Sequence, residues 1–517
     1  MNLKAVGWLL GCVLLLFAGF MLVPAVVSAW YGERQAFEGC IWSAVVTAAA
    51  GGILSILCMG STVTTDGRVD YFRREGLAAV GLAWLGGCVA GALPFLFSGT
   101  FSSPTDAFFE SASGITTTGS TILTGDAIDA LPMGIAFWRS FTHWLGGVGI
   151  VLVFVVLFPA GGRSLFRSEV PGISREAVQH RVRDSALGLV RVYVGLTLAQ
   201  VALLWIFGMR EAEHPLFESF LHAFGTLATG GFSNHSASVA FFDSWKVELV
   251  IIVFMFGAGI NFAVYDTFLR QGFRRAWQLA KGSAEVRLYT AIVFGSTAVI
   301  ALVLWFWGGS NGDPTSDLPN YASLLLSLRD SLFAVISVQT STGYGTANFD
   351  LWPDFCRMLL MLLAFIGACA GSTGGGLKMI RFMIMAKAAI AGIQRFSRPR
   401  AIHAVRVGDQ RLEDSMVGMV MAYCGLWILI FMIGTMMLAG MDLQPDGVHQ
   451  DQVLLIAATS VLATLNNIGP GLAAVGPAEN FAFMPDAAKL LLSFLMILGR
   501  LEFYAIVVLF VPRFWRH

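Results

Sequence analysis

Polar segments rich in threonine and glycine interrupt a chain that is otherwise strongly apolar. The clearest reads TSTGYGTANF (340–349) and stands between two apolar runs. Three other segments align with it without gaps, and a glycine then falls ten residues after the first aligned position in all four. The aligned segments are FESASGITTTGST (109–121), FLHAFGTLATGGF (220–232), FAVISVQTSTGYG (333–345) and TSVLATLNNIGPG (459–471), with Gly119, Gly230, Gly343 and Gly469 in register.

Oxygen atoms are the ligands that these segments offer. Glycine permits the unusual backbone that turns consecutive carbonyls to one side, and neighbouring threonines add uncharged hydroxyls. Because unpaired carbonyls are costly in lipid, we expect the four loops to meet in a ring, where their carbonyls can replace the hydration shell of a cation. The expected ligands are Thr117, Thr118, Gly119, Ala228, Thr229, Gly230, Ser341, Thr342, Gly343, Asn467, Ile468 and Gly469.

The loop chemistry favours a monovalent cation. No Asp or Glu occurs within the Thr/Gly cores, which suits K⁺ better than Ca²⁺, because Ca²⁺ prefers carboxylates among its ligands. An anion would instead call for backbone N–H groups or arginine. Asp106, Glu110, Asp350 and Asp354 stand near the loops. Acids at the mouth of a pore can concentrate cations, but we interpret most of these four as solvated loop or helix-cap carboxylates and assign them no site.

Composition indicates the environment of the loops. The chain has 517 residues, of which 56% are hydrophobic and only 13% charged, and its mean hydropathy is +0.71. These values are typical of a polytopic membrane protein. The formal net charge of zero gives no argument for a nucleic-acid partner, and the seven cysteines show no spacing of a disulfide framework or a metal site.

Ten apolar runs are long enough to cross the hydrocarbon core of a bilayer. They lie near 5–30, 41–60, 77–98, 132–160, 185–208, 245–269, 286–308, 355–391, 412–440 and 486–512. We expect the first to be a retained helix and no cleaved signal. Lys and Arg concentrate in the connections 61–76, 161–184, 270–285 and 378–411 and in the C-terminal tail, so both termini are predicted to be cytoplasmic.

The last eight runs form four pairs, and each pair encloses one aligned loop preceded by a half-length apolar stretch. The predicted fold is an all-α polytopic membrane protein with four pseudo-symmetric repeats of helix, pore helix, filter loop and helix around one pore, plus two N-terminal transmembrane helices. The expected domains are 1–76 for the N-terminal pair and 77–184, 185–285, 286–411 and 412–517 for the repeats.

The run 355–391 is too long for one span and contains GACAGSTGGG (367–376). Because each glycine disfavours a helix by about 1 kcal/mol relative to alanine, the helix should break in mid-membrane, either as a kink that only serves packing or as a functional loop under the filter. Arg500 and Glu502 lie inside the last run, where charges are usually functional. Residues two apart do not face each other on a helix, so we expect no pairing between them.

Other classes of protein fit less well. A secondary transporter usually interrupts two corresponding helices, whereas four loops share one pattern here. An embedded hydrolase would need a nucleophile, a base and an orienting acid. His143, His222 and His235 lie near serines in the sequence, but no such order stands out, so we predict polar packing for them and no enzyme.

The loop STGYG (341–345) resembles the filter of K⁺ channels, and four unequal loops in one chain resemble the Trk/Ktr/HKT superfamily of K⁺ transporters. The similarity is greatest to the bacterial TrkH-type potassium-translocating subunits and covers nearly the whole chain. It is carried by TTTGST (116–121), FWRSFTHWLGGVGI (137–150), TGGFS (229–233), NNIGPG (466–471) and GACAGSTGGGLKMIRF (367–382).

This resemblance implies potassium uptake at the plasma membrane by a homodimer with one pore in each protomer. It implies a TrkA-like cytoplasmic subunit that binds NAD(H) or ATP/ADP, since this chain has no nucleotide-binding motif of its own. It also implies a gate made of Gly371, Ser372, Thr373, Gly374, Gly375, Gly376, Lys378 and Arg500. Gly119 replaces the serine of Na⁺-permeable plant relatives and favours K⁺, while Na⁺ permeation and coupling to H⁺ or Na⁺ stay open.

Overall fold

A computed structural model describes residues 1–59, 73–157, 175–209, 212–310, 321, 323–398, 404–408, 410–441, 443 and 452–515 of the chain. Most of the basic connections 61–76 and 161–184 therefore lies outside the described residues. The described part is mostly helical, and its only strands are those of a short antiparallel ribbon of β1 (Arg406–Val407) and β2 (Gln410–Arg411). The predicted all-α fold class is confirmed.

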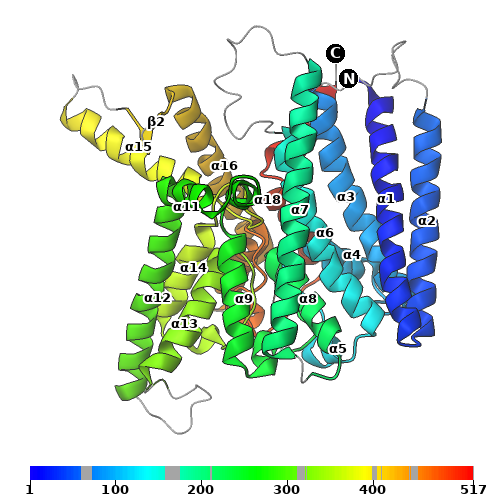
Figure 1. Cartoon of the computed structure of the whole chain (residues 1–517), viewed down its shortest axis with the longest axis horizontal. Coiled ribbons are helices and arrows are strands. Elements are labelled where there is room, and N and C mark those ends of the chain that lie inside the picture. Colours follow the sequence, from blue (N-terminus) through cyan, green and yellow to red (C-terminus); the bar gives the residue numbers. More distant parts are fainter. Residues whose placement is uncertain are drawn as a thin grey trace.

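Two long helices form an N-terminal pair at one side of the molecule (Figure 1). They are α1 (Leu3–Trp30) and α2 (Arg34–Cys58), which contact each other along their length and pack on α3 and α6. The carboxylate of Glu33, in the turn between them, accepts hydrogen bonds from the N–H groups of Met133 at 2.6 Å and Gly134 at 3.0 Å. The pair is thereby fixed to the start of α6.

Four units of similar construction follow, each with an outer helix, a half-length helix, a loop and a second helix. The first has α3 (Arg73–Phe97), α4 (Pro104–Ile115) and α6 (Met133–Leu157); the second α7 (Arg175–Phe207), α8 (Pro215–Leu227) and α9 (Trp245–Ala258); the third α12 (Ala284–Ser310), α13 (Leu324–Gln339) and α14 (Asp354–Phe365); the fourth α16 (Asp414–Ala439), α17 (Val453–Leu465) and α18 (Asp486–Arg500). Short helices α5 (Gly125–Asp129), η3 (Ser238–Phe242), η4 (Phe349–Leu351) and η6 (Ala473–Val475) lie in the connections.

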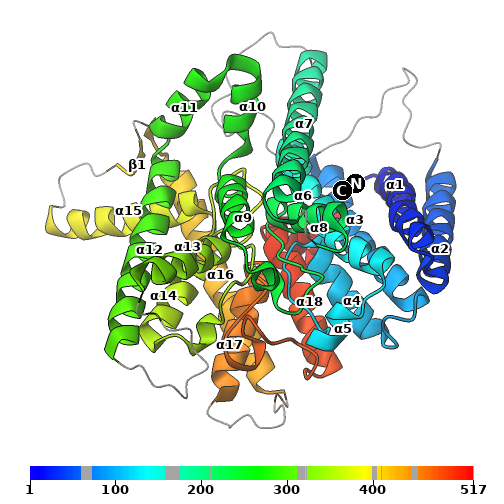
Figure 2. The same cartoon turned by 60° about the horizontal axis from the view of Figure 1, so that its bottom comes forward.

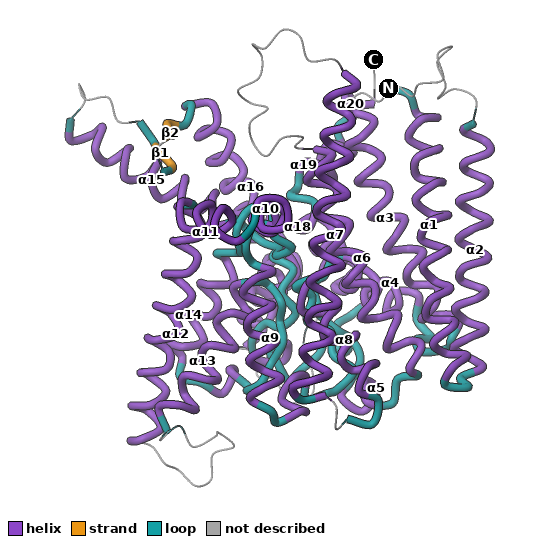
Figure 3. The backbone as a smooth tube through the Cα atoms, viewed as in Figure 1, coloured by secondary structure: helices purple, strands orange, loops and turns teal. Residues whose placement is uncertain are grey.

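The half-length helices start with recognisable signals and end at the centre of the molecule. Ser103 caps α4 by accepting a hydrogen bond from the N–H of Asp106 at 3.4 Å, and Pro104 occupies the first turn. Pro215 begins α8 in the same way. With 12 to 16 residues, these helices are too short to span a bilayer, and Figure 3 shows the loops that follow them gathered among the long helices.

The second helix is broken in three of the four units. The predicted break in the third unit is confirmed, since α14 ends at Phe365 and α15 (Met379–Ser397) begins after an irregular segment. The predicted span over 245–269 is bent: α9 ends at Ala258, and α10 (Phe262–Gln271) turns away from it by 94°. Asn261 contributes to the break, because it caps α10 by accepting the N–H of Ala263 at 2.8 Å.

The predicted last span over 486–512 is also interrupted. Helix α18 ends at Arg500, and Glu502 and Phe503 adopt left-handed backbone angles before α19 (Tyr504–Val507), η7 (Val508–Phe510) and α20 (Pro512–Trp515). Among the described residues, six helices are long and apolar enough to cross a membrane, or seven if α9 and α10 count as one bent span. Both termini lie at the same end of the molecule, the end that also holds α15, α10 and α11 (Phe273–Gly282) (Figures 1 and 2).

Candidate functional site

The four half-length helices end in the same backbone turn. Two residues beyond the helix, Thr117, Thr229, Ser341 and Asn467 adopt left-handed φ angles of 53°, 55°, 59° and 54°. The N–H of the next residue (Thr118, Gly230, Thr342 and Ile468) then donates to the carbonyl five residues back at 2.8 Å in every loop. These shared hydrogen bonds establish that the four loops are structural equivalents.

The second loop is shifted by one residue relative to the alignment of the sequence. Its left-handed Thr229 matches Thr117, so Gly231, and not Gly230, is the equivalent of Gly119 and Gly343. Gly119, Gly231 and Gly343 have φ of 85°, 78° and 84°, whereas Gly469 is absent from the left-handed residues. The second-loop residues equivalent to 117–119 are therefore 229–231 and not the expected 228–230, and Ala228 caps the end of α8.

These glycines approach one another closely enough to define a ring. A methyl group on Gly119 would overlap the carbonyl of Gly230, and one on Gly231 would overlap the carbonyl of Thr342. A methyl on Gly343 would lie 2.9 Å from the nitrogen of Gly469, and one on Gly469 would lie 3.0 Å from the carbonyl of Gly119. The loops therefore contact each other in chain order and close upon themselves, as the sequence predicts.

Hydroxyl and amide side chains form hydrogen bonds within the loops and between them. Thr116 and Thr118 share a hydrogen bond of 2.7 Å, and Thr340 and Thr342 share the equivalent bond at 2.7 Å in the third loop. Asn467 donates to the hydroxyl of Thr118 at 3.0 Å and so connects the fourth loop to the first. The hydroxyls of these four threonines are thus hydrogen-bonded within the protein.

A buried ion pair connects the first two loops. Arg139 of α6 donates to Glu110 at 2.6 Å and to the carbonyl of Ser233 at 2.6 Å, and its guanidinium lies 3.6 Å from the centre of the Phe232 ring. Glu110 also accepts the N–H of Ile122 at 3.1 Å. Glu110 is fully buried, so it is not one of the solvated carboxylates expected among the four acids.

The other three acids near the loops differ from Glu110 in exposure and partners. Asp106 accepts a hydrogen bond from Lys489 at 2.6 Å, and Asp350 accepts the N–H of Ala473 at 3.1 Å, so both hold neighbouring loops in place. Asp354 pairs with Arg357, but its side chain is 86% exposed, which agrees with the solvated carboxylate that we expected at that position.

The histidines of the site serve packing. Nδ1 of His143 lies 2.7 Å from the carbonyl of Gly114, and its Nε2 accepts the N–H of Phe232 at 3.2 Å. This arrangement requires the neutral tautomer and fixes the second loop to the first helix end. His222 lies between Glu218 and Ser233 but is wholly buried, and its Nδ1 is 2.9 Å from the main-chain carbonyl of Glu218, so no substrate reaches it.

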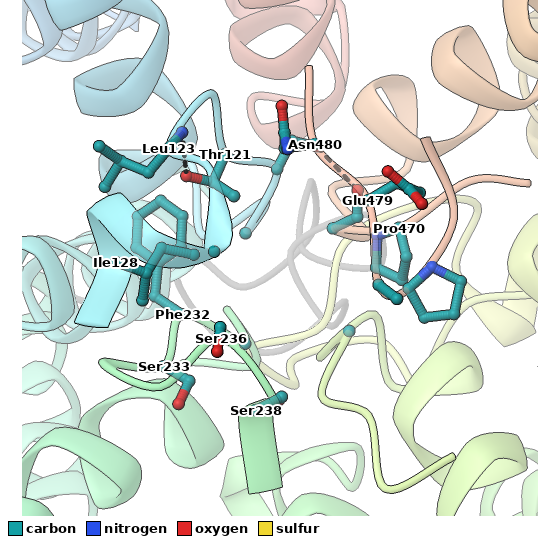
Figure 4. A pocket seen from close by; sticks show the side chains of 18 of the residues that line it. Thr121, Leu123, Ile128, Phe232, Ser233, Ser236, Ser238, Pro470, Glu479 and Asn480 are labelled. Carbon is teal, nitrogen blue, oxygen red and sulfur yellow. Dashed lines mark hydrogen bonds between the residues drawn. The ribbon is translucent and has the colours of Figure 1, made fainter. Parts of the chain in front are cut away.

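A cavity of about 120 Å³ opens on one side of the ring, and all four loops line it. Figure 4 shows Thr121, Phe232, Ser233 and Pro470 around this space, together with Glu479 and Asn480 of the fourth unit. The residues that line it follow the ring glycines in the chain. It is therefore a vestibule on the side of the ring that faces away from the helix ends.

The irregular segment between α14 and α15 contacts the opposite side of the ring; we call residues 366–378 the intramembrane loop. The N–H of Gly375 donates to the hydroxyl of Ser341 at 2.6 Å, and a methyl group on Gly375 would overlap the carbonyl of Asn466. Arg500 donates to the carbonyl of Thr373 at 2.7 Å, and Lys378 donates to the carbonyl of Gly374. The expected gate residues 371–376 and 378 thus lie in one loop beside the ring, and Arg500, at the end of α18, donates to it.

Glu502 has a different partner from Arg500. Its carboxylate pairs with Arg381 of α15, and the guanidinium of Arg381 lies 4.0 Å from the centre of the Tyr423 ring. Glu502 thus pairs with a residue of another helix, in agreement with the sequence argument that residues two apart would not pair.

Two features that hold the intramembrane loop were missed by the sequence argument. The break between α9 and α10 pairs with the loop through main-chain bonds from Cys369 to Gly259 at 3.0 Å and from Phe262 to Gly371 at 2.9 Å. Glu285, at the start of α12, accepts the N–H groups of Ala370 at 2.7 Å and Ile380 at 3.1 Å. A carboxylate at the start of a predicted span is the signal that could have drawn attention to Glu285.

The chain is similar to known potassium transport proteins along its whole length. Residues 48–517 match the model of the TrkH family, described as cation transport proteins. The Trk system potassium uptake protein TrkH of Escherichia coli K12 is 35% identical, and that of Halomonas elongata is 33% identical, each over 100% of both chains. The crystal structure of the potassium transporter TrkH from Vibrio parahaemolyticus matches with a TM-score of 0.85 and 32% identity over 100% of both chains.

These similarities agree with the fold. The apolar helices and the full-length match to a helical transporter make the chain a multi-pass membrane protein, and a family of transport proteins confirms the prediction that it is not an enzyme. The family model covers residues 48–517, and the relatives above 30% identity and the structural match cover the whole chain. The chain belongs to the TrkH family of cation transport proteins.

Proposed function

We propose that this protein takes up potassium across the bacterial plasma membrane through a selective pore within each chain. The observation that carries the proposal is the ring of four equivalent turns at Thr117, Thr229, Ser341 and Asn467. Four uncharged loops provide carbonyl oxygens without carboxylates, which suits a monovalent ion that must bind weakly enough to leave. The names of the relatives support potassium as that ion.

The helix ends add an electrostatic argument for a cation. The C-terminus of an α-helix carries about half a negative charge from its unpaired carbonyls. Helices α4, α8, α13 and α17 all end beside the ring, so their dipoles favour a positive ion there. The helix ends carry only partial charges, so they stabilise K⁺ without the tight binding that full carboxylate charges would cause.

We propose that the intramembrane loop is the gate of this pore. It contacts the ring from the side of the termini and is held by Arg500, Lys378 and Glu285. Opening would require these hydrogen bonds to break together. In this proposal the described arrangement is the closed one, because Gly374 and Gly375 lie directly against the helix ends at Thr340 and Asn466.

Assembly and orientation complete the proposal. The chain forms a homodimer in the inner membrane, with both termini in the cytoplasm because Lys and Arg concentrate in the connections at that end. A TrkA-like cytoplasmic subunit that binds NAD(H) or ATP/ADP supplies regulation, and this chain carries no cofactor of its own.

A second candidate function is Na⁺ permeation, or symport of potassium with H⁺ or Na⁺. It is favoured by the departure of the fourth loop, where Gly469 lacks the left-handed φ of its equivalents and Ile468 stands where Thr118 and Thr342 stand. An irregular ring holds its oxygens less uniformly and should discriminate less between ions.

Flux of K⁺, Rb⁺ and Na⁺ into liposomes that contain the purified protein tests the proposal. Fast, passive K⁺ and Rb⁺ flux that exceeds Na⁺ flux is the expected result, and addition of the regulatory subunit with nucleotide should increase it. Equal flux of Na⁺ would favour a nonselective pore. A dependence of K⁺ flux on a gradient of H⁺ or Na⁺ would favour the symporter.

A further inference from the structure

Helices α10 and α11 project from the body of the molecule on the side of the termini (Figure 2). Phe262 is the only buried residue of α10 and Ala276 the only buried residue of α11. The side chains of Phe273 and Trp277 are 68% and 59% exposed, and their rings stack with centroids 6.3 Å apart. Such aromatic surface is unusual for a helix that faces only water.

Helix α11 is amphipathic in a way that fits a membrane surface. At about 100° per residue, one face carries Phe273, Ala276, Trp277, Leu279 and Ala280, and the opposite face carries Arg274, Arg275, Gln278 and Lys281. Its charged side chains are all basic. A helix with aromatic residues on one face and basic residues on the other lies in the plane of an anionic membrane, with its apolar face among the acyl chains.

The direction of the two helices supports this placement. Helix α9 follows the course of the spans, and α10 leaves it at 94°, so α10 and the connected α11 run across the spans and not along them. They do so at the end of the molecule that also holds both termini (Figure 1). Helix α11 ends at Gly282, two residues before the apolar span of α12 begins at Ala284, a position that fits the level of the lipid headgroups.

The same segment is attached to the intramembrane loop at both of its ends. Before α10, the elbow exchanges main-chain bonds with the loop, from Cys369 to Gly259 at 3.0 Å and from Phe262 to Gly371 at 2.9 Å. After α11, Glu285 accepts the N–H groups of Ala370 at 2.7 Å and Ile380 at 3.1 Å. Movement of α10 and α11 relative to the body must therefore strain or release these bonds.

We propose that α10 and α11 bind the headgroups of anionic lipids and that this binding holds the intramembrane loop in the described, closed arrangement. The proposal rests on the proposed function, since it takes the loop to be the gate. Lipid is favoured over a protein partner because the aromatic face and the basic face run along one helix at headgroup level. Loss of the anionic lipid or of the basic side chains should free the helices and raise the basal flux.

The test compares Rb⁺ flux, without regulatory subunit, in vesicles of phosphatidylcholine alone and of phosphatidylcholine with phosphatidylglycerol. Wild-type flux should be lower by about fivefold in the anionic vesicles, near the lower end of the range for coupled sites. The double variant Arg274→Gln/Arg275→Gln should keep the higher flux in both. Arg274→Lys/Arg275→Lys should restore the lipid dependence, because it keeps the charge.

The matched control is Arg34→Gln/Lys246→Gln, which removes two exposed basic side chains at the opposite end and should behave as wild type. Glu285→Gln, which weakens the link to the loop, should raise flux in both vesicles. Equal wild-type flux in both vesicles would overturn the inference, and so would a change of oligomeric state in the Gln double variant, which would make α11 a protein interface. Deletion of 371–375 should give Rb⁺ flux in either lipid. Absence of Rb⁺ flux in this variant would count against the proposed function itself.

Discussion

At the scale of the residue, the ring depends on glycines that have no room for a side chain. Gly343 has a φ of 84°, and a methyl group there would lie 2.9 Å from the nitrogen of Gly469 and 3.0 Å from Cδ of Pro470. A side chain at this position would both strain the backbone, by about 1 kcal/mol or more, and displace the fourth loop. The geometry of two neighbouring loops would change together.

Gly343→Ser is therefore expected to reduce the preference for K⁺ over Na⁺, because displaced carbonyls no longer match one ion size. The ratio of K⁺ to Na⁺ flux in liposomes measures it. Gly345→Ser is the matched control, since no heavy atom lies within 4 Å of a Cβ built there. An unchanged flux ratio in Gly343→Ser, with a protein that still elutes as a single species, would remove this loop from the filter.

Glu110→Gln tests the buried pair behind the first two loops. Loss of the carboxylate leaves Arg139 buried without its charged partner, and such a change typically destabilises a protein by about 3–5 kcal/mol. The midpoint of thermal unfolding in detergent should fall, and the K⁺ to Na⁺ ratio should fall with it. Glu38→Gln, which removes the partner of the exposed Arg34, should change neither. Normal stability in Glu110→Gln would mean that hydrogen bonds to Thr121 and Ile122 suffice.

At the scale of the element, Arg500 joins the end of α18 to the intramembrane loop. Its Nη1 donates to the carbonyl of Thr373 at 2.7 Å. Arg500→Ala should raise basal flux severalfold, because it removes a charge-assisted hydrogen bond that only the closed arrangement makes. Arg500→Lys, which keeps the charge on a shorter side chain, should give a basal flux between those of wild type and Arg500→Ala. Size-exclusion chromatography separates this effect from misfolding, and a lower flux in a well-folded Arg500→Ala protein would contradict the gate assignment.

The breaks in the second helices could be predicted only where the sequence loses its helical composition. The glycines of 367–376 predicted the intramembrane loop. The break at 259–261 could not be predicted in this way, because the residues on both sides of GAGIN (257–261) are apolar and are typical of one continuous span. It depends on the cap at Asn261 and on pairing with a loop more than 100 residues away, which a local pattern does not contain.

The register of the second loop was missed for a related reason. Its TGG motif offers two glycines for the ring, and a gapless alignment takes the first of them. In the folded chain Thr229 itself adopts the left-handed angle, and Gly230 must be a glycine because His143 packs directly on its Cα. The choice is thus made by a histidine on another helix, and only the three-dimensional structure contains that information.

At the scale of the whole molecule, four related units enclose one ring, while the elements outside it differ. The sequence predicted the units, since hydropathy and the aligned loops repeat along the chain. It could not predict that α15 would project from the body, as Figure 1 shows at the upper left. Ile390, Ile393 and Phe396 of this helix are exposed, the last by 91%.

We expect the proposed homodimer to form through the projecting helix α15. Exposed apolar side chains three residues apart lie along one face of a helix, and a second copy can bury them. Ile393→Ser/Phe396→Ser should therefore shift the mass measured by light scattering in detergent from dimer toward monomer. Leu22→Ser/Val26→Ser, on the exposed face of α1 at the far side of the molecule, should leave the mass unchanged. Because each ring is complete within one chain, the monomeric variant should still transport K⁺, and loss of all flux on dissociation would mean that the gate needs the partner chain.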